Sequence, residues 1–323
     1  MIWFIMLLLL FTGVESVSLS NKPVLTKKDI EAMMTSLSNW GRWGKSDELG
    51  ALNLITPPKR KQAAALVREG VTVSLAHNVI KIKEESSQPF ELRMVQTGQS
   101  PSAEYAGDIY SVQYHGYTQT HIDALCHLFY QGKIYNGFLQ QTVTDQGAAK
   151  LSIIQVKNGI FTRGILMDIP SLLGKPYLAG DRAIYPEDLD AWEKKAGLKV
   201  SSGDAILIRT GRWARRKAEG TWEIEKNSAG LHASCLPWLK KRDIAVLGSD
   251  LASDVMPSQV EGVAMPVHQV ILNAMGVPIL DNCDFEDLSK FAQNSKRWEF
   301  LLTVAPLAVD GGTGSPINPL ATY

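Results

Sequence analysis

Cysteine and histidine are scarce in this sequence. Three cysteines, Cys126, Cys235 and Cys283, and six histidines occur among 323 residues. Three cysteines are too few for a disulfide framework, and only Cys235 with Cys283 is considered as a pair. The folded chain must therefore be stabilised by its core. With 45% hydrophobic residues it is long enough to bury a substantial one, as one large domain or two modest ones.

An excess of charge of either sign is also missing. Lysine plus arginine and aspartate plus glutamate both number 33, so the formal net charge is zero. A chain without a basic field has no long-range attraction for nucleic acid or for anionic lipid. We therefore expect no nucleic-acid partner.

No hydrophobic run is long enough to make a typical membrane-spanning helix. The apolar run at the N-terminus covers residues 1–11, about half of the ~20 residues that a spanning helix needs. Small residues follow it, with a plausible cleavage site near Ser18. We predict a signal peptide over residues 1–18, a secreted protein and no stable membrane anchor. An uncleaved anchor or a buried N-terminal helix are the alternatives.

Local patterns predict a mixture of helices and strands. Capping residues, proline at the start and glycine at the end favour helices in the ranges 26–40, 56–70 and 185–197. Short runs of branched or bulky apolar residues favour strands in the ranges 71–80, 163–169, 203–211, 243–250, 277–280 and 300–309. Strand and helix alternate from Arg163 onward, which indicates an α/β fold with helices packed on a sheet.

Domain organisation follows from features that the sequence does not have. It contains no internal repeat, no low-complexity tract and no long linker rich in proline, glycine or serine. We predict a single domain over residues 19–323.

The stretch THIDALCH, residues 120–127, concentrates groups that bind metal ions. If residues 115–123 form a strand, His121 and Asp123 lie on one face with their Cα atoms about 6–7 Å apart. Imidazole and carboxylate are ligands that zinc and manganese accept, and His127 completes a site if the chain turns after Asp123. A polar strand edge is the alternative, but the apolar neighbours of these side chains weaken it.

A family resemblance begins at this stretch. THIDALCHLFYQGKIYNG resembles the signature His-x-Gly-Thr-His-x-Asp-x-x-x-His of the cyclase-like metal hydrolases, which include kynurenine formamidases and isatin hydrolases. Thr120, His121, Asp123 and His127 match it position by position. WGRWGKSDELGALNLITP and APLAVDGGTGSPINP are similar to the N-terminal and C-terminal segments of the longer members. The resemblance implies a swivelling β/β/α fold, hydrolysis of an amide or lactam bond, a zinc or manganese ion, a small-molecule substrate and a homodimer.

Two positions depart from that signature. Tyr117 stands where the family has its first histidine, and Gln119 stands where it has glycine. A phenol is a rare metal ligand and an amide oxygen a weak one. His115 lies six residues before His121, roughly 20 Å away along an extended strand, so it replaces the lost ligand only if the backbone bulges.

The family's second contribution is a distant histidine followed about a dozen residues later by glutamate. PVHQVILNAMGVPILDNCDFEDL supplies His268 and, at the position resembling the glutamate, Asp281. By this resemblance both are candidate metal ligands and the candidate general acid/base pair. A residue lining a helix near Pro266 and a turn at Asp281 are the structural alternatives. Asp250 and Asp254 follow a predicted strand, where ligand-facing groups and plain turns are both common.

Three functions are consistent with these residues. The first is a metal-dependent hydrolase that acts on an amide or lactam bond through activated water. The second is a relative that binds a small molecule without turning it over, which Tyr117 and Gln119 suggest. The third is a lyase or dehydratase that uses the same metal as a Lewis acid. Nucleophilic catalysis is disfavoured because no Gly-x-Ser-x-Gly elbow occurs, and the glycine-rich residues 311–315 lack the lysine of a phosphate loop.

Overall fold

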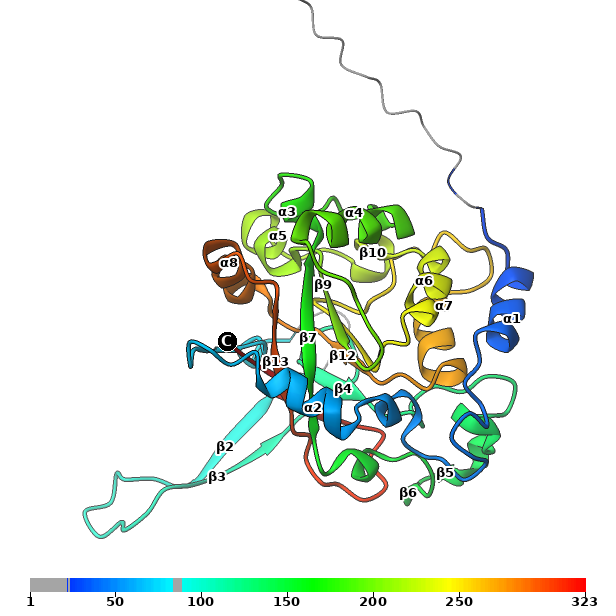
Figure 1. The fold of residues 1–323 in the computed structure, drawn as a ribbon. Coiled ribbons are helices and arrows are strands. Elements are labelled where there is room, and N and C mark those ends of the chain that lie inside the picture. The colour runs from blue at the N-terminus through cyan, green and yellow to red at the C-terminus, as the bar shows by residue number, and fades with distance from the viewer. Residues whose placement is uncertain (1–21, 23, 84–88) are drawn as a thin grey trace, which may run out of the picture.

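The computed structural model describes residues 22, 24–83 and 89–323, so the signal peptide predicted for residues 1–18 lies outside the described part. The main element is a nine-stranded sheet with the order β1-β15-β13-β7-β9-β11-β12-β4-β14 (Figure 1). Its strands are β1 (Thr72–Ser74), β4 (His121–Asp123), β7 (Ile160–Asp168), β9 (Ala205–Arg209), β11 (Val246–Ser249), β12 (Ile279–Asp281), β13 (Glu299–Val304), β14 (Gly314–Pro316) and β15 (Leu320–Thr322).

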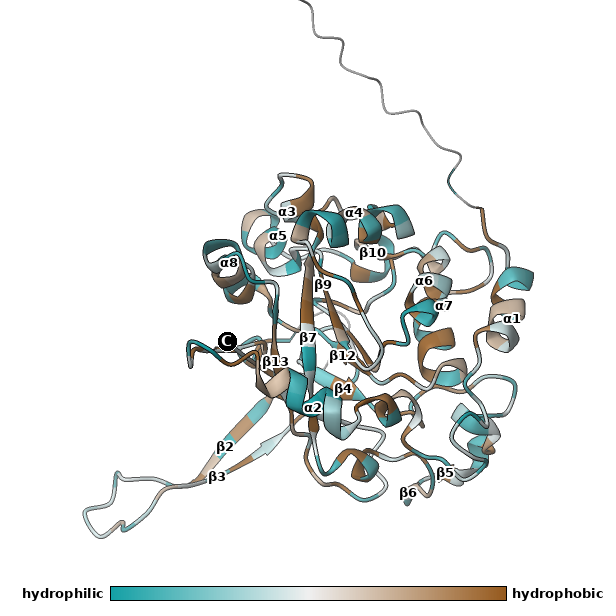
Figure 2. Ribbon diagram, viewed as in Figure 1, coloured by the Kyte–Doolittle hydropathy of each residue, from teal (hydrophilic) through white to brown (hydrophobic). Residues whose placement is uncertain are grey.

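The centre of this sheet is parallel and buried. Strands β7, β9, β11 and β12 run parallel to one another, whereas β13, β15, β1, β4 and β14 join by antiparallel pairing. Every residue of β9, β11 and β12 is buried, and Figure 2 shows β9 and β12 as mostly hydrophobic. Burial on both faces is the reason these strands are continuous apolar runs without alternation.

Helices pack on this sheet. Helix α2 crosses β7 and β13, while α3 and α4 pack against β9 and β7 (Figure 1). No helix among the described residues is long and apolar enough to cross a membrane. The helices are α1 (Lys27–Ser36), α2 (Pro57–Ala64), α3 (Ile169–Leu172), α4 (Pro186–Ala196), α5 (Arg212–Glu219), α6 (Leu236–Lys241), α7 (Pro266–His268), which continues as a π-helical turn (Gln269–Ala274), and α8 (Glu286–Ser295).

The predicted helices begin at the residues that the capping pattern of the sequence indicated. Thr26 and Asp29 form a reciprocal capping box before α1, and Thr56 caps α2 ahead of its two prolines. Gly197 ends α4 in the left-handed conformation, with φ 66°. The three predicted helices exist and are shorter than their sequence ranges.

One local prediction is wrong. The strand expected over residues 115–123 is only the three residues of β4, because the chain bends between His115 and Gln119. The glycine-rich residues 311–315 form a turn at Gly311 and then enter β14, which pairs with β4. The three cysteines are each buried and free, so Cys235 and Cys283 form no disulfide.

A separate hairpin leaves the main body of the protein. Strands β2 (Glu91–Gln96) and β3 (Gly107–Ser111) pair only with each other and project outward (Figure 1). Their side chains are almost all exposed or half-exposed. Two further pairs of two-residue strands occur among the described residues: β5 (Val143–Thr144) with β6 (Gly147–Ala148), and β8 (Ala183–Ile184) with β10 (Gly230–Leu231).

Candidate metal centre

Antiparallel pairing of β4 with β12 brings distant residues together. In this register Asp281 lies opposite His121, and Ile279 lies opposite Asp123. His121, Asp123 and Asp281 are all buried, and one potential ligand atom from each lies within 4.8 Å of the other two. The Nδ1 atom of His121 lies 2.9 Å from the carbonyl of Gln119, which fixes the tautomer and leaves Nε2 facing Asp123 at 3.4 Å.

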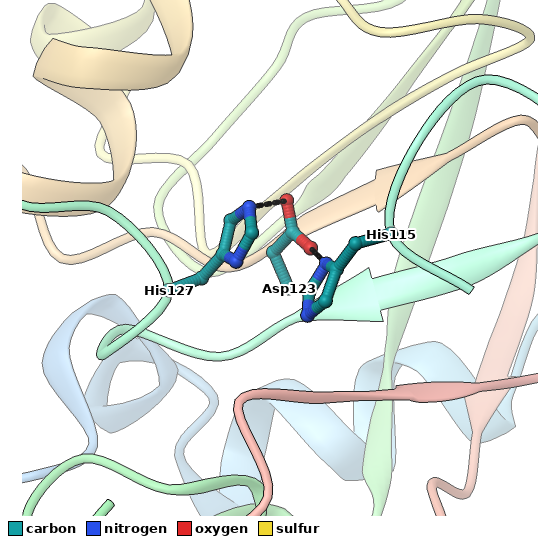
Figure 3. Close-up of side chains that lie close together, drawn as sticks. All are labelled: His115, Asp123 and His127. Carbon is teal, nitrogen blue, oxygen red and sulfur yellow. Dashed lines mark ion pairs between the residues drawn. The ribbon is translucent and has the colours of Figure 1, made fainter. Parts of the chain in front are cut away.

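Two further histidines reach the same aspartate. Nδ1 of His115 lies 2.9 Å from Oδ1 of Asp123, and Nε2 of His127 lies 3.9 Å from Oδ2 (Figure 3). The two imidazole rings stack with their centroids 3.9 Å apart. Nε2 of His115 is 3.0 Å from the hydroxyl of Thr313, a contact that leaves Nδ1 for Asp123.

Three atoms of this cluster lack the partners that buried polar atoms need. His115 Nδ1, Asp123 Oδ1 and Asp281 Oδ1 are buried and, among the described residues, have no hydrogen-bond partner. Buried polar atoms are almost always hydrogen-bonded, and each exception requires an explanation. The nitrogen Nδ1 of His115 and the oxygen Oδ1 of Asp123, 2.9 Å apart, are close enough for one cation to bind both. The donor set, imidazole with carboxylate, is the one that zinc and manganese accept.

The protonation states favour metal binding as well. Burial lowers the pKa of His127 to about 4, against the opposing charge of Asp123, so its imidazole is neutral near pH 7. Burial would raise the pKa of Asp123, but His127, His115 and His121 outweigh it and hold that pKa well below its usual value. Neutral imidazoles and an ionised carboxylate are the forms that bind metal ions.

His268 occupies the edge of this cluster. Asp254 accepts hydrogen bonds from the backbone N–H of Val267 at 2.7 Å and of His268 at 3.1 Å, which fixes the start of α7. The same carboxylate lies 2.8 Å from His268 Nδ1, while Nε2 lies 3.1 Å from Asp281 and 4.0 Å from Asp123. Burial lowers the pKa of His268, but Asp281 and Asp254 outweigh it and raise this pKa well above its usual value.

Tyr117 and Gln119 do not point into the cluster as ligands. The amide of Gln119 bonds the backbone of Ile80, donating to its carbonyl at 3.1 Å. The hydroxyl of Tyr117 donates to Glu225 at 3.4 Å. His115, two residues before Tyr117, brings an imidazole to Asp123 instead.

A buried polar network shapes the bend that carries His115. Asn282 donates to the carbonyls of Gly116 at 2.7 Å and of Gln119 at 3.1 Å, and accepts a hydrogen bond from Arg212 at 2.8 Å. Arg212 also donates to the carbonyl of Tyr117. Arg212 is 3% exposed, so these hydrogen bonds are made by a buried guanidinium.

Five residues singled out in the sequence, His121, Asp123, His127, His268 and Asp281, lie together in this cluster.

Sequence reasoning missed the placement of two others. His115 is expected to replace the lost ligand only if the backbone bulges, and Gly116, with φ 127°, permits such a bend. The pair His115-Gly116 was the available signal. Asp254 was equally consistent with a turn, and no local pattern showed that it holds His268.

Comparisons with known proteins identify the family of this chain. Residues 53–254 match the family model named Cyclase, described as "Putative cyclase". This match spans more than half of the chain. The chain belongs to the Cyclase family. The comparison with curated proteins returned no match.

Solved structures share the Cyclase fold. A protein described as a novel cyclase is 30% identical, with a TM-score of 0.80, over 89% of this chain and 100% of its own. Isatin hydrolase A from Ralstonia solanacearum is 20% identical, with a TM-score of 0.56, over 80% of this chain and 93% of its own. An isatin hydrolase bound to the product analogue thioisatinate is 18% identical, with a TM-score of 0.57, over 81% and 94% respectively. The predicted fold and the predicted family are confirmed.

Proposed function

We propose that this member of the Cyclase family is a metal-dependent hydrolase that cleaves an amide or lactam C–N bond. The observation that carries the proposal is the set of buried, unpartnered ligand atoms on His115, Asp123 and Asp281. Two proteins of the same fold are named isatin hydrolases, and one of them is bound to a product analogue. Their names support a small cyclic amide as the substrate class.

Zinc or manganese is the proposed metal, held in one or both of two overlapping ligand sets. One set is His115, Asp123 and His127, and the other is His121, Asp123 and Asp281. Because Asp123 belongs to both, it would hold the metal in either set. A divalent metal bound there lowers the pKa of a water molecule toward neutrality and polarises a carbonyl group.

His268 is the proposed general acid/base, together with Asp281. The carboxylate of Asp254 accepts the Nδ1 proton and fixes the ring, so that Nε2 faces the centre. A protonated histidine oriented in this way can deliver its Nε2 proton to the leaving nitrogen, and the neutral ring can then accept a proton from water. Asp281, 3.1 Å from Nε2, stabilises the protonated form of the ring.

His115 favours catalysis over binding without turnover. The reason to suspect a non-catalytic relative was the loss of a histidine at 117, and His115 brings an imidazole to the same aspartate. A lyase or dehydratase with the same metal differs in product. Hydrolysis in ¹⁸O-labelled water incorporates the label, and dehydration does not.

Metal content per chain tests the proposal first. We expect one or two equivalents of zinc or manganese by elemental mass spectrometry, lost in Asp123→Ala and retained in the matched control Asp284→Ala, whose carboxylate pairs with His77 outside the cluster. The metal-containing protein should then hydrolyse aryl formamides or cyclic amides. Absence of metal after reconstitution would remove the hydrolase proposal.

Secretion and self-association are also part of the proposal. Residues 1–18 have the apolar core and small residues of a signal peptide. N-terminal sequencing of protein recovered from the medium of a secretory host tests this, with a new N-terminus near residue 19 expected. A homodimer is proposed because the β2–β3 hairpin projects exposed apolar side chains that a second copy can cover.

A further inference from the structure

A cavity of about 600 Å³ lies along the segment that leads into α7. Its wall is the segment 256–265, together with Tyr117 and Glu225. This volume lies within the range of about 300–1,000 Å³ that small-molecule sites occupy. The cavity is therefore large enough for a ring-sized substrate.

Tyr117 connects this cavity to the centre. Its ring packs against the apolar cluster that contains Leu251, Met256 and Met265, and α7 with His268 begins directly after Met265. Tyr117 lies two residues from His115, and Met265 lies three residues from His268, so two segments that line the cavity lead directly into the metal cluster.

The cavity wall is apolar except at one place. Methionine, valine and proline side chains supply most of the segment 256–265. The hydroxyl of Ser258 is engaged by the carbonyls of Val260 and Val263. The polar groups left for a ligand along this wall are the Tyr117 hydroxyl and the Glu225 carboxylate, 3.4 Å apart.

We propose that this cavity binds the apolar body of the substrate, and that Glu225, paired with Tyr117, selects substrates that carry an N–H or ammonium group there over substrates that carry a carboxylate. This inference rests on the proposed function, since it assigns the substrate side of the same site. A carboxylate accepts hydrogen bonds from N–H groups and repels a second carboxylate. The guanidinium of Arg212 is directed to Asn282 and to the carbonyl of Tyr117.

Binding of three small probes tests the selectivity without any need for turnover. Benzylamine, benzyl alcohol and benzoate share one ring and differ in the polar group. Each is titrated by saturation-transfer NMR into the full chain after treatment with a chelator, so that benzoate cannot bind through a metal ion. We expect benzylamine to bind most tightly and benzoate most weakly.

Three variants locate the binding. Glu225→Gln should weaken benzylamine binding about two- to fivefold and leave benzyl alcohol unchanged, as expected for a partly solvated charge. Ala264→Trp, at an exposed position of the wall, should fill the cavity and abolish binding of all probes. Glu223→Gln, whose carboxylate pairs with Lys226 and does not line the cavity, should behave as wild type.

Two results would overturn the inference: benzoate binding as tightly as benzylamine, or Ala264→Trp retaining probe binding while its thermal unfolding shows an intact fold. Either result leaves the metal and hydrolysis measurements untouched. The converse result is a protein that shows the expected probe selectivity but contains no metal or shows no turnover. This result would contradict the hydrolase proposal and still support the binding site.

Discussion

At the residue scale, His115 reaches the metal cluster only because the chain bends between His115 and Gln119. Its Nδ1 lies 2.9 Å from Asp123 with no hydrogen bond to account for the approach. Loss of this ligand in His115→Ala should weaken zinc binding about tenfold or more, since even residues behind the ligands change metal affinity by 10- to 100-fold. A competition titration with a chelating dye measures the dissociation constant.

Two controls separate His115 from its neighbours. His77→Ala removes a histidine that pairs with Asp284 and stacks on Trp213, outside the cluster, and should leave zinc affinity unchanged. Tyr117→Phe removes only a hydroxyl that faces Glu225 and should also leave it unchanged. If Tyr117→Phe weakened zinc binding as much as His115→Ala, the assignment of the ligand to His115 would be wrong.

The sequence could name some of these side chains and not others for a physical reason. His121, Asp123 and His127 are separated by spacings that one strand and one turn bring together, so local pattern was sufficient. His115 reaches the cluster only through a bend held by Asn282, which is 166 residues away from Gly116 along the chain. Such a contact leaves no local periodicity.

At the scale of elements, Asn282 joins the end of β12 to the bend before β4. Its backbone has φ 53°, a value that glycine adopts freely, so Asn282→Gly removes the side chain without straining the backbone. The variant loses hydrogen bonds to Gly116, Gln119 and Arg212. We expect about 2 kcal/mol less stability to urea and weaker zinc binding.

A double-mutant cycle shows whether Asn282 acts through the bend. If Asn282 serves to place His115, the effects of Asn282→Gly and His115→Ala on zinc affinity should not add, because the second change has no ligand left to displace. Additive effects on zinc affinity would mean that Asn282 stabilises the protein without orienting His115.

The carboxylate of Glu193 joins α4 to Val200 and Arg242 through hydrogen bonds. From these bonds we predict that the free energy of unfolding depends on pH. The carboxylate accepts hydrogen bonds from Val200 at 2.9 Å and from Arg242 at 2.8 Å and 3.0 Å. Burial opposes ionisation, but Arg242 and Val200 prevail and lower the pKa of Glu193 to about 2 from 4.5. A lowered pKa contributes stability above pH 4.5 that is lost as the pH falls toward 2.

Urea unfolding of the wild type and of Glu193→Gln measures this contribution. The difference in unfolding free energy between the two proteins should shrink by about 2 kcal/mol from pH 6 to pH 3. Carboxylates elsewhere titrate equally in both proteins and cancel. A difference that is constant over this pH range would show that the Glu193 charge does not stabilise the folded state.

At the scale of the whole molecule, the buried centre of the sheet could be predicted and its margins could not. Strands β7, β9 and β11 are apolar runs because both faces are covered, and such runs are visible in sequence. Strands β2 and β3 lack that signal, since nearly every position is exposed. Their pairing therefore leaves no pattern of buried apolar residues in the sequence.

The β2–β3 hairpin yields the last prediction. An isolated two-stranded hairpin is at best marginally stable in water, and contiguous exposed apolar side chains mark interaction surfaces. Leu92 lies opposite Tyr110 on one face, and these residues are 44% and 53% exposed. If a second copy covers this face, the double substitution of Leu92→Glu and Tyr110→Glu should convert a dimer into a monomer, because the introduced carboxylates would be desolvated at the interface. Light scattering measures the mass, with Val24→Glu, at an 89% exposed position outside the hairpin, as the control that stays dimeric. A wild-type protein that is monomeric at micromolar concentration, or a double variant that remains dimeric, would show that no second copy covers this hairpin.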